Sequence, residues 1–273
     1  MPASQRPLRL KQGPSTTLGA TILEYPVQLQ LKTWQFVEDY LKTKTGIIIP
    51  IGSTEQHGPT GLIGTDALTA EMIGRGVGEK VGALVAPTIS VGMAQHHLAF
   101  PGSMTVRPST LIALIRDQVM SLARNGFTRF YFLNGHGGNI ATVTASFSEI
   151  YAERSLERMS NQPPLKCVLR NWWESGGVTS LRRELYGGSE GSHATPSEVA
   201  LTWYRFPETM QQKPMEPRVA PNGSFADAED YRRAFPDGRI GSDPNLATPE
   251  HGKRIYDTAV EDVARDYQAW VAR

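Results

Sequence analysis

The stretch Gly46-Ile-Ile-Ile-Pro-Ile51, continued by the polar segment Gly52-Ser-Thr-Glu-Gln-His-Gly58, decides the fold class of this chain. A short, unbroken β-branched run is typical of a strand that is buried on both faces of a parallel sheet. The segment that follows is rich in turn-forming polar residues and predicts a loop at the carboxyl end of that strand. We therefore expect an α/β protein whose polar side chains gather where strands end.

Helix and strand patterns alternate along the rest of the chain. Apolar spacing predicts helices over 66–81, 108–125, 140–158, 196–206 and 249–272, and short apolar runs predict strands over 83–89, 129–133 and 165–173. This succession favours a mostly parallel sheet with helices on both faces, within one domain over 21–273. We expect an irregular segment over 207–248, and a flexible N-terminal arm or oligomer contact over 1–20.

Composition argues against several classes of partner. The 273 residues include 28 basic and 27 acidic side chains, a formal charge of +1, so we expect no nucleic-acid partner. No apolar run approaches the ~20 residues that span a bilayer, and the N-terminus lacks the apolar stretch of a secretory signal. We therefore expect a cytoplasmic protein that does not insert into membranes. The single cysteine, Cys167, leaves nitrogen and oxygen as ligands for any metal ion.

Side chains of metal-ligand type follow two of the predicted strands. Glu55 and His57 are two residues apart, so in an extended loop both can project the same way. Asp66 lies at the expected start of the next helix, where its carboxylate could bridge two cations. His136 stands between glycines in Asn134-Gly-His-Gly-Gly-Asn139, after the strand at 129–133. Since ligands bind beyond the carboxyl ends of strands in open α/β sheets, the pattern predicts a site for zinc, manganese or iron(II).

Other interpretations of these residues stay open. An isolated Glu-x-His is more often a pair of solvent-exposed polar residues than a metal site, and Asp66 could instead cap a helix. The glycine-rich loop around His136 could bind an anion, although it lacks the lysine of a phosphate-binding loop. Ser53, His57 and Asp66 could suggest a nucleophilic triad, but the chain contains no Gly-x-Ser-x-Gly elbow.

Four motifs in chain order resemble those of the creatininase (creatinine amidohydrolase) family. They are Ile49-Pro-Ile-Gly-Ser-Thr-Glu-Gln-His-Gly-Pro59 with Gly64-Thr-Asp66, His97-Leu-Ala-Phe-Pro-Gly102, Asn134-Gly-His-Gly-Gly-Asn139, and Gly191-Ser-His-Ala194 with Glu198. The resemblance implies a three-layer α/β/α fold, a homohexamer, and a binuclear divalent-metal centre that hydrolyses carbon–nitrogen bonds in cyclic or linear amides.

The resemblance also implies metal ligands, residue by residue. Glu55 and His136 would bind one metal ion, His57 would bind the other, and Asp66 would bridge the two. Glu198, which follows the His-Ala motif, would be a further ligand and would take part in catalysis.

We expect further residues of these motifs at the substrate. His193 would donate a proton or orient the substrate, and His97 and Asn134 would lie close to it. Trp172 and Trp173 could stack on a planar substrate, but adjacent residues of a strand point to opposite faces, so only one of them is expected near the site.

The chain departs from the family pattern at two places. Creatininase itself has an aromatic residue and a ligating glutamate after its Asn-Gly-His string, where this chain has Gly137 and Gly138. Glu198 would then bind the second metal ion, or that ion would be held more weakly. Thr195 and Pro196 stand where the usual glycine follows the His-Ala motif. These changes put creatinine in doubt as the substrate and leave hydrolysis intact.

The sequence therefore predicts a hydrolase with two divalent metal ions that cleaves a small non-peptide amide. A bound metal ion lowers the pKa of water from about 15.7 toward ~7, and the leaving nitrogen then needs a proton, which His193 would supply. Three alternatives remain: a peptidase-like protein that trims a modified peptide, creatinine amidohydrolase itself, and a metal-binding assembly protein without catalysis. Product analysis and a Glu55→Gln variant would separate them.

Overall fold

The computed structural model describes residues 27–156 and 163–273, so the predicted arm at 1–20 lies outside the described residues. The described strands form one four-stranded sheet in the order β2-β1-β3-β4, and every pair is parallel. The strands are β1 (Gly46–Ile51), β2 (Leu84–Val85), β3 (Arg129–Asn134) and β4 (Lys166–Asn171). The predicted α/β class and parallel sheet are confirmed.

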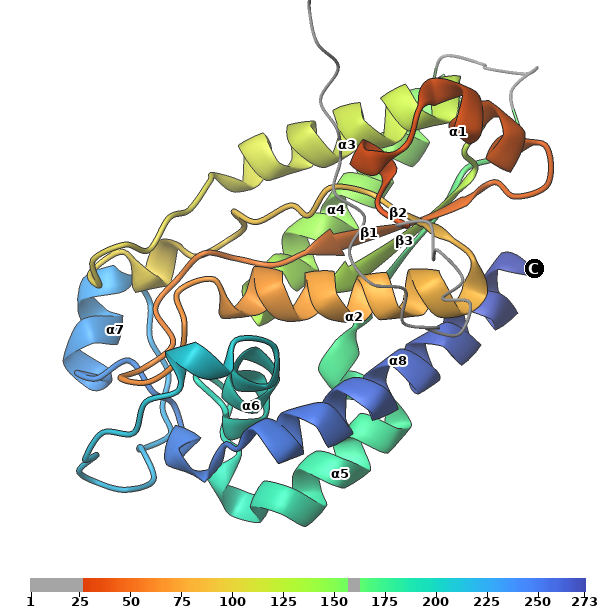
Figure 1. The fold of residues 1–273 in the computed structure, drawn as a ribbon. Helices are drawn as coiled ribbons and strands as arrows, with labels where there is room; N and C mark the ends of the chain where they lie inside the picture. Colours follow the sequence, from red (N-terminus) through yellow and green to blue (C-terminus); the bar gives the residue numbers. More distant parts are fainter. Residues whose placement is uncertain (1–26, 157–162) are drawn as a thin grey trace, which may run out of the picture.

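In the described parts of the chain, eight α-helices connect and cover these strands (Figure 1). They are α1 (Trp34–Leu41), α2 (Thr65–Val81), α3 (Pro108–Arg124), α4 (Ile140–Leu156), α5 (Gly176–Tyr186), α6 (Pro196–Arg205), α7 (Ala228–Ala234) and α8 (Pro249–Val271). Short 3-10 turns occupy Leu29–Leu31, Gln95–His97, Gly137–Asn139, Trp172–Glu174, Gly187–Ser189, Pro207–Thr209 and Pro244–Leu246. Within these described residues, we find no helix with both the length and the apolar character needed to span a bilayer.

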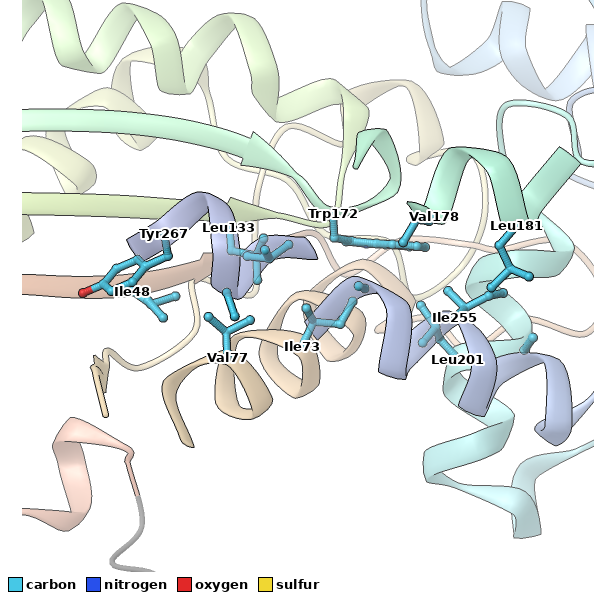
Figure 2. Close-up of a cluster of buried hydrophobic side chains, with 14 of the residues drawn as sticks. Ile48, Ile73, Val77, Leu133, Trp172, Val178, Leu181, Leu201, Ile255 and Tyr267 are labelled. Atoms are coloured by element: carbon cyan, nitrogen blue, oxygen red, sulfur yellow. The ribbon is translucent and has the colours of Figure 1, made fainter. Parts of the chain in front are cut away.

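Two apolar layers enclose the sheet, one on each face. Ile48 of β1 points into the layer formed with α2, α5, α6 and α8, whereas Ile47 and Ile49 point into the layer formed with α1, α3 and α4. Figure 2 shows the first layer, where Trp172 lies between the sheet and the helices. The Ile-rich run of β1 is therefore buried on both faces, as the sequence predicts, and the fold has three layers.

The structure corrects several predicted boundaries. The strand expected over 83–89 is regular only at β2, because Pro87 has no N–H to donate to a sheet ladder. The chain continues beside β1 beyond that point, where Ile89 N donates to Pro50 O at 3.0 Å. The strand expected over 165–173 ends at Asn171, and a 3-10 turn follows it.

The segment 207–248 is more ordered than its sequence suggests. It contains α7, and Tyr231, Phe235 and Ile240 pack with Phe100 in a small separate apolar cluster. The cluster anchors this segment over the carboxyl edge of the sheet, and Phe225 and Tyr231 line a cavity there.

Candidate metal centre

Four side chains from three separate segments meet at the carboxyl edge of the sheet. Glu55 and His57 lie in the loop after β1, Asp66 lies in the first turn of α2, and His136 follows β3. All four residues are buried. Strand order explains their meeting, because β1 and β3 are neighbours and Ile51 pairs with Asn134 at their ends.

Asp66 stands between two groups of potential ligands. Its Oδ1 lies 3.0 Å from His57 Nε2, and its Oδ2 lies 3.1 Å from His136 Nδ1. One group that could hold an ion contains Glu55, Asp66 and His136, and another contains His57, Asp66 and Glu198; within each group, one ligand atom per residue lies within 4.8 Å of the others. The two groups share Asp66, so its two carboxylate oxygens can serve two cations.

Several polar atoms of this cluster lack hydrogen bonds. Among the described residues, the buried atoms without a hydrogen-bond partner include Glu55 Oε1, His57 Nε2 and Asp66 Oδ2. His57 Nε2 approaches Asp66 Oδ1, but the contact lacks hydrogen-bond geometry. A buried polar atom without a partner is costly, and a cation would satisfy these atoms together. The nitrogen and oxygen donors therefore fit first-row divalent ions.

Backbone carbonyls orient the two histidine rings. His57 Nδ1 lies 3.2 Å from the carbonyl oxygen of Glu55, and His136 Nε2 lies 2.9 Å from that of Met93. When each of these nitrogens donates to its carbonyl, the opposite nitrogen faces the cluster with a free electron pair. Such second contacts are typical of histidines that bind metal ions.

The carboxylates control the charge of these histidines in the metal-free protein. Burial lowers the pKa of His57, but Asp66, Glu198 and Glu55 more than offset it and bring that pKa to about 10. Burial likewise lowers the pKa of His136, and the carboxylates of Glu55 and Asp66 raise it to about 9. Protons on two rings therefore compensate the buried carboxylates when no cation is bound.

The loop after β3 has its shape fixed by asparagine side chains and glycines. Asn134 Nδ2 donates to His136 O at 2.7 Å and to Asn171 Oδ1 at 2.8 Å, and its Oδ1 accepts from His136 N. Asn134 is fully buried and its amide holds the loop, while its contact with substrate stays a prediction. A Cβ on Gly138 would lie 2.4 Å from His136 Nε2, so only glycine fits beside this ring.

Two further histidines approach Glu55. His97 Nε2 lies 3.1 Å from Glu55 Oε1, and His193 Nδ1 lies 3.9 Å from the same atom. Burial, followed by the charges of neighbouring histidines, holds the pKa of His97 at about 3 and that of His193 well below its ordinary value. Both rings are therefore neutral. Ala194, directly after His193, has a positive φ of 52°, a backbone conformation that non-glycine residues seldom adopt.

The side chain of Gln56 links these two rings, and the sequence analysis did not identify it. Its Nε2 lies 3.0 Å from His97 Nδ1, 2.9 Å from His193 Nε2 and 3.0 Å from Gly238 O. His193 Nε2 also lies 2.9 Å from the carbonyl oxygen of Gln56. The position of Gln56 between two predicted ligands was the only available signal, because its partners come from distant segments.

A capping box at the start of α6 positions Glu198. Thr195 N and Thr195 Oγ1 donate to Glu198 Oε2 at 2.9 and 2.8 Å, and Glu198 N donates to Thr195 Oγ1 at 3.2 Å. Burial raises the pKa of Glu198, while the charge of His57 and the bonds from Thr195 oppose that rise. The departure at Thr195 and Pro196 thus gives α6 a rigid start, which holds Glu198 beside His57 and Asp66.

Two cavities adjoin the cluster. One of about 170 Å³ is lined by Asp66, His136, His193 and Glu198 together with His97 and the aromatic rings of His96, Phe225 and Tyr231. The other, of about 380 Å³, is lined by Trp173, Ile140 and Arg182, and also reaches Glu198. Sequence reasoning did not identify Phe225 or Tyr231, since both come from the segment expected to be irregular.

The paired tryptophans have different environments. Trp172 has no exposed surface and lies in the apolar layer with Val178 and Leu181, as Figure 2 shows. Trp172 is therefore the member of the pair that lies in the core, as predicted for one of the two. Trp173 is partly buried and lines the larger of the two cavities.

Comparison with known proteins adds independent findings. The family model for creatininase, described as creatinine amidohydrolase, matches residues 30–267. The mycofactocin precursor peptide peptidase of Mycobacterium tuberculosis is 29% identical over 242 residues, which cover 84% of this chain and 87% of the relative. The 3-dehydro-scyllo-inosose hydrolase of Thermotoga maritima is 29% identical over 192 residues, which cover 68% of this chain and 58% of the relative.

Solved structures share the fold. A structure described as creatininase Mn aligns with a TM-score of 0.77 and 23% identity, and covers 90% of this chain and 99% of its own. A mutant creatininase of the Zn–Zn type aligns with a TM-score of 0.76 and 22% identity, with the same coverage of 90% and 99%. The predicted three-layer fold therefore agrees with known structures.

Proposed function

Because the chain belongs to the creatininase family, we propose that it is a metal-dependent amidohydrolase that cleaves a carbon–nitrogen bond in a small cyclic or linear amide other than a peptide. The observation that carries this proposal is the buried ligand cluster in which Asp66 serves two groups at once. Buried polar atoms without hydrogen-bond partners in that cluster support a role in binding cations.

We assign the ligands as two groups with one shared residue. Glu55, His136 and Asp66 would hold one divalent ion, and His57, Asp66 and Glu198 would hold the other. Glu198 would then bind the second metal ion in place of the glutamate that this chain lacks at Gly138. The similar solved structures include a manganese creatininase and a creatininase of the Zn–Zn type, which supports manganese or zinc as the metal. Iron(II) suits the same donors.

Divalent ions in this site would activate a water molecule and stabilise the negative charge that develops on the substrate oxygen. Residues of the chain itself would then carry the protons that move during the reaction. His193 Nε2 lies against the Gln56 carbonyl, which leaves Nδ1 facing the cluster as a neutral acceptor. We assign to this nitrogen the proton that the attacking water loses, and its return to the leaving nitrogen as the carbon–nitrogen bond breaks.

A peptidase-like activity is a second candidate, since the Mycobacterium tuberculosis relative carries that description. The two adjoining cavities offer room beyond a small ring and favour a substrate with substituents. Product analysis after incubation with cyclic amides, formamides and short peptides would separate the two activities. Exclusive cleavage of peptides would overturn the non-peptide assignment and keep the metal mechanism.

Metal dependence can be tested directly. Chelation should abolish hydrolysis, and addition of Zn²⁺ or Mn²⁺ should restore it. Glu55→Gln should lower the metal content and reduce kcat by roughly a hundredfold or more, because a ligand and a buried charge are lost. Glu149→Gln, on the exposed side of α4, is the matched control and should behave like wild type. Full turnover by a metal-free sample would refute the proposal.

We also propose that the chain forms the hexamer that its family resemblance implies. Exposed apolar side chains of Leu31, Trp34 and Phe36 near the start of the described chain support a contact between copies. Analytical ultracentrifugation at micromolar concentration tests this assembly, and a monomer under those conditions would contradict it.

A further inference from the structure

The two cavities beside the cluster meet at the same three residues. Gly137, Ser192 and Glu198 line both of them. Since Glu198 belongs to the proposed ligand set, the site is open in two directions. A substrate bond held at the cluster therefore has space on both of its sides.

Gly137 controls the place where the cavities meet. A Cβ on Gly137 would contact no heavy atom within 4 Å, whereas a Cβ on the adjacent Gly138 would collide with the ring of His136. Gly137 is exposed and borders both cavities, so a side chain at this position would extend into the open space between them. The absence of a side chain thus keeps the two spaces connected.

The walls of the cavities indicate what they accept. In the smaller cavity, His96 stacks on Phe225 with ring centroids 4.9 Å apart, and Tyr231 lies beside them. In the larger one, Ile140 is 37% exposed and lies with Trp173. The charge of Arg182 is compensated, because its Nε donates to Glu190 Oε1 at 2.6 Å. Each cavity therefore offers an apolar or aromatic surface to a substituent, beside polar residues that include Glu174, Thr195 and Ser197 in the larger one.

We propose that the substrate is a linear amide that carries an apolar or aromatic group on each side of the scissile bond, with Gly137 as the residue that determines this specificity. The proposal rests on the proposed metal-dependent function and narrows its substrate class. One substituent occupies the cavity at Ile140 and Trp173, and the other lies against Phe225 and Tyr231. A small ring without substituents fills only part of this space.

Hydroxamic acids provide a binding test that does not depend on turnover, because they chelate metal ions through two oxygens. The Mn²⁺-loaded protein is titrated calorimetrically with four compounds: acetohydroxamic acid, phenylacetohydroxamic acid, N-benzylacetohydroxamic acid and the N-benzyl derivative of phenylacetohydroxamic acid. Each single extension should tighten binding by about tenfold or more, since each buries a phenyl ring. The doubly extended compound should bind most tightly.

Variants locate the effect. Gly137→Tyr should reduce the gain from at least one extension, measured relative to acetohydroxamic acid on the same variant, from about tenfold to less than about twofold. Ile140→Ser should weaken binding of the extension that enters the cavity at Ile140 and Trp173 by severalfold. This second variant keeps the proposal testable if Gly137→Tyr does not fold. Gly188→Tyr is the control, because a side chain at this exposed glycine also meets nothing within 4 Å and Gly188 does not line either cavity.

The outcomes separate the two proposals. If acetohydroxamic acid binds but neither extension or only one tightens binding in the wild-type protein, the two-sided substrate is wrong and the metal-dependent function stands. Unchanged gains in both Gly137→Tyr and Ile140→Ser would remove Gly137 as the determinant. If no hydroxamic acid binds to protein supplied with Mn²⁺, the proposed function itself fails, and the inference fails with it.

Discussion

At the scale of single residues, Gln56 decides which nitrogen of each flanking histidine carries a proton. Its Nε2 can donate to His97 Nδ1, which leaves the proton of His97 on Nε2, where it faces Glu55. Its carbonyl oxygen accepts from His193 Nε2. The side-chain amide therefore places the proton of His97 on the nitrogen that faces Glu55, and the backbone carbonyl places that of His193 on Nε2.

We predict that Gln56→Leu destabilises the protein and disturbs His97. The part-buried Gly58 N–H would lose its partner, and the buried Gly238 carbonyl would keep only the Tyr231 hydroxyl, so the free energy of unfolding should fall by about 1–3 kcal/mol. Denaturant titration measures this loss, and nitrogen-15 NMR of the histidine rings should show that His97 Nδ1 no longer accepts a hydrogen bond. Gln268→Leu, on the exposed face of α8, is the control. Unchanged stability and ring spectra would contradict this role for Gln56.

Metal affinity should rise steeply with pH. In the metal-free protein His57 and His136 have pKa values of about 10 and about 9, so both rings are protonated at neutral pH. Each must release its proton before its nitrogen can bind a cation, and apparent affinity should increase up to about a hundredfold per pH unit below these values. Calorimetry between pH 6 and 8 tests the slope, and an affinity that is constant across this range would contradict it.

The same protons make the stability of the metal-free protein depend on pH in the opposite direction. A pKa that is higher in the folded than in the unfolded chain means that the folded state binds protons more strongly. The stabilisation is therefore complete below the ordinary histidine value of 6.5 and disappears as pH rises through about 9 to 10. Urea titration of the chelated protein should show falling stability across this window. A rise would show that protonated rings do not compensate the carboxylates.

At the scale of elements, the start of α6 couples helix stability to metal binding. We predict that Thr195→Ala lowers the free energy of unfolding by about 1 kcal/mol, because the helix loses its cap. It should also weaken metal binding, since Glu198 loses the hydroxyl bond that holds its carboxylate and opposes the rise of its pKa. Thr195→Ser should restore both properties, and both are measured by denaturant and metal titrations.

A second cap separates these two effects. Thr33 accepts from Phe36 N at the start of α1, far along the chain from the ligands, and Thr33→Ala should cost similar stability. It should leave metal affinity unchanged. Equal loss of affinity in Thr33→Ala and Thr195→Ala would show that the metal site responds only to overall stability.

Elements with strong local patterns could be predicted from the sequence. The apolar run of β1 and the helical spacing of α2, α3 and α8 gave boundaries close to those of the structure, because burial on defined faces produces these patterns. Helix α5 was missed because it begins with Gly176 and Gly177, which have low helix propensity, and its apolar face is completed only by packing on α8. Contacts with distant segments override local preference there.

The same distinction applies to the site. Glu55, His57 and His136 could be placed because each follows a predictable strand, and parallel strands bring their ends together. Sequence could not show that Asn134 turns inward to hold its own loop. It could not show that the segment around Tyr231 returns to the same cavity, because that depends on a separate apolar cluster.

At the scale of the whole molecule, the sheet joins the two apolar layers. Alternate residues of β1 enter opposite layers, so neither layer can be lost without exposing one face of the same strand. The ligand loops extend from this sheet and from α2, which packs on it. We therefore propose that the predicted domain over 21–273 unfolds as one cooperative unit.

Two core substitutions test this cooperativity. Ile73 and Ile115 are fully buried in opposite layers, and replacement of either by alanine should cost about 2–5 kcal/mol through lost burial and a residual cavity. Trp172 and Trp203 report on the Ile73 layer by fluorescence, whereas far-UV circular dichroism reports on all helices. In Ile115→Ala both signals should shift together, although the substitution lies in the layer away from these tryptophans. Leu114→Ala, at the exposed neighbouring position, should have a much smaller effect. A fluorescence transition that stays in place while the circular dichroism signal splits would mean that the two layers unfold independently, and the ligands could then separate without complete unfolding.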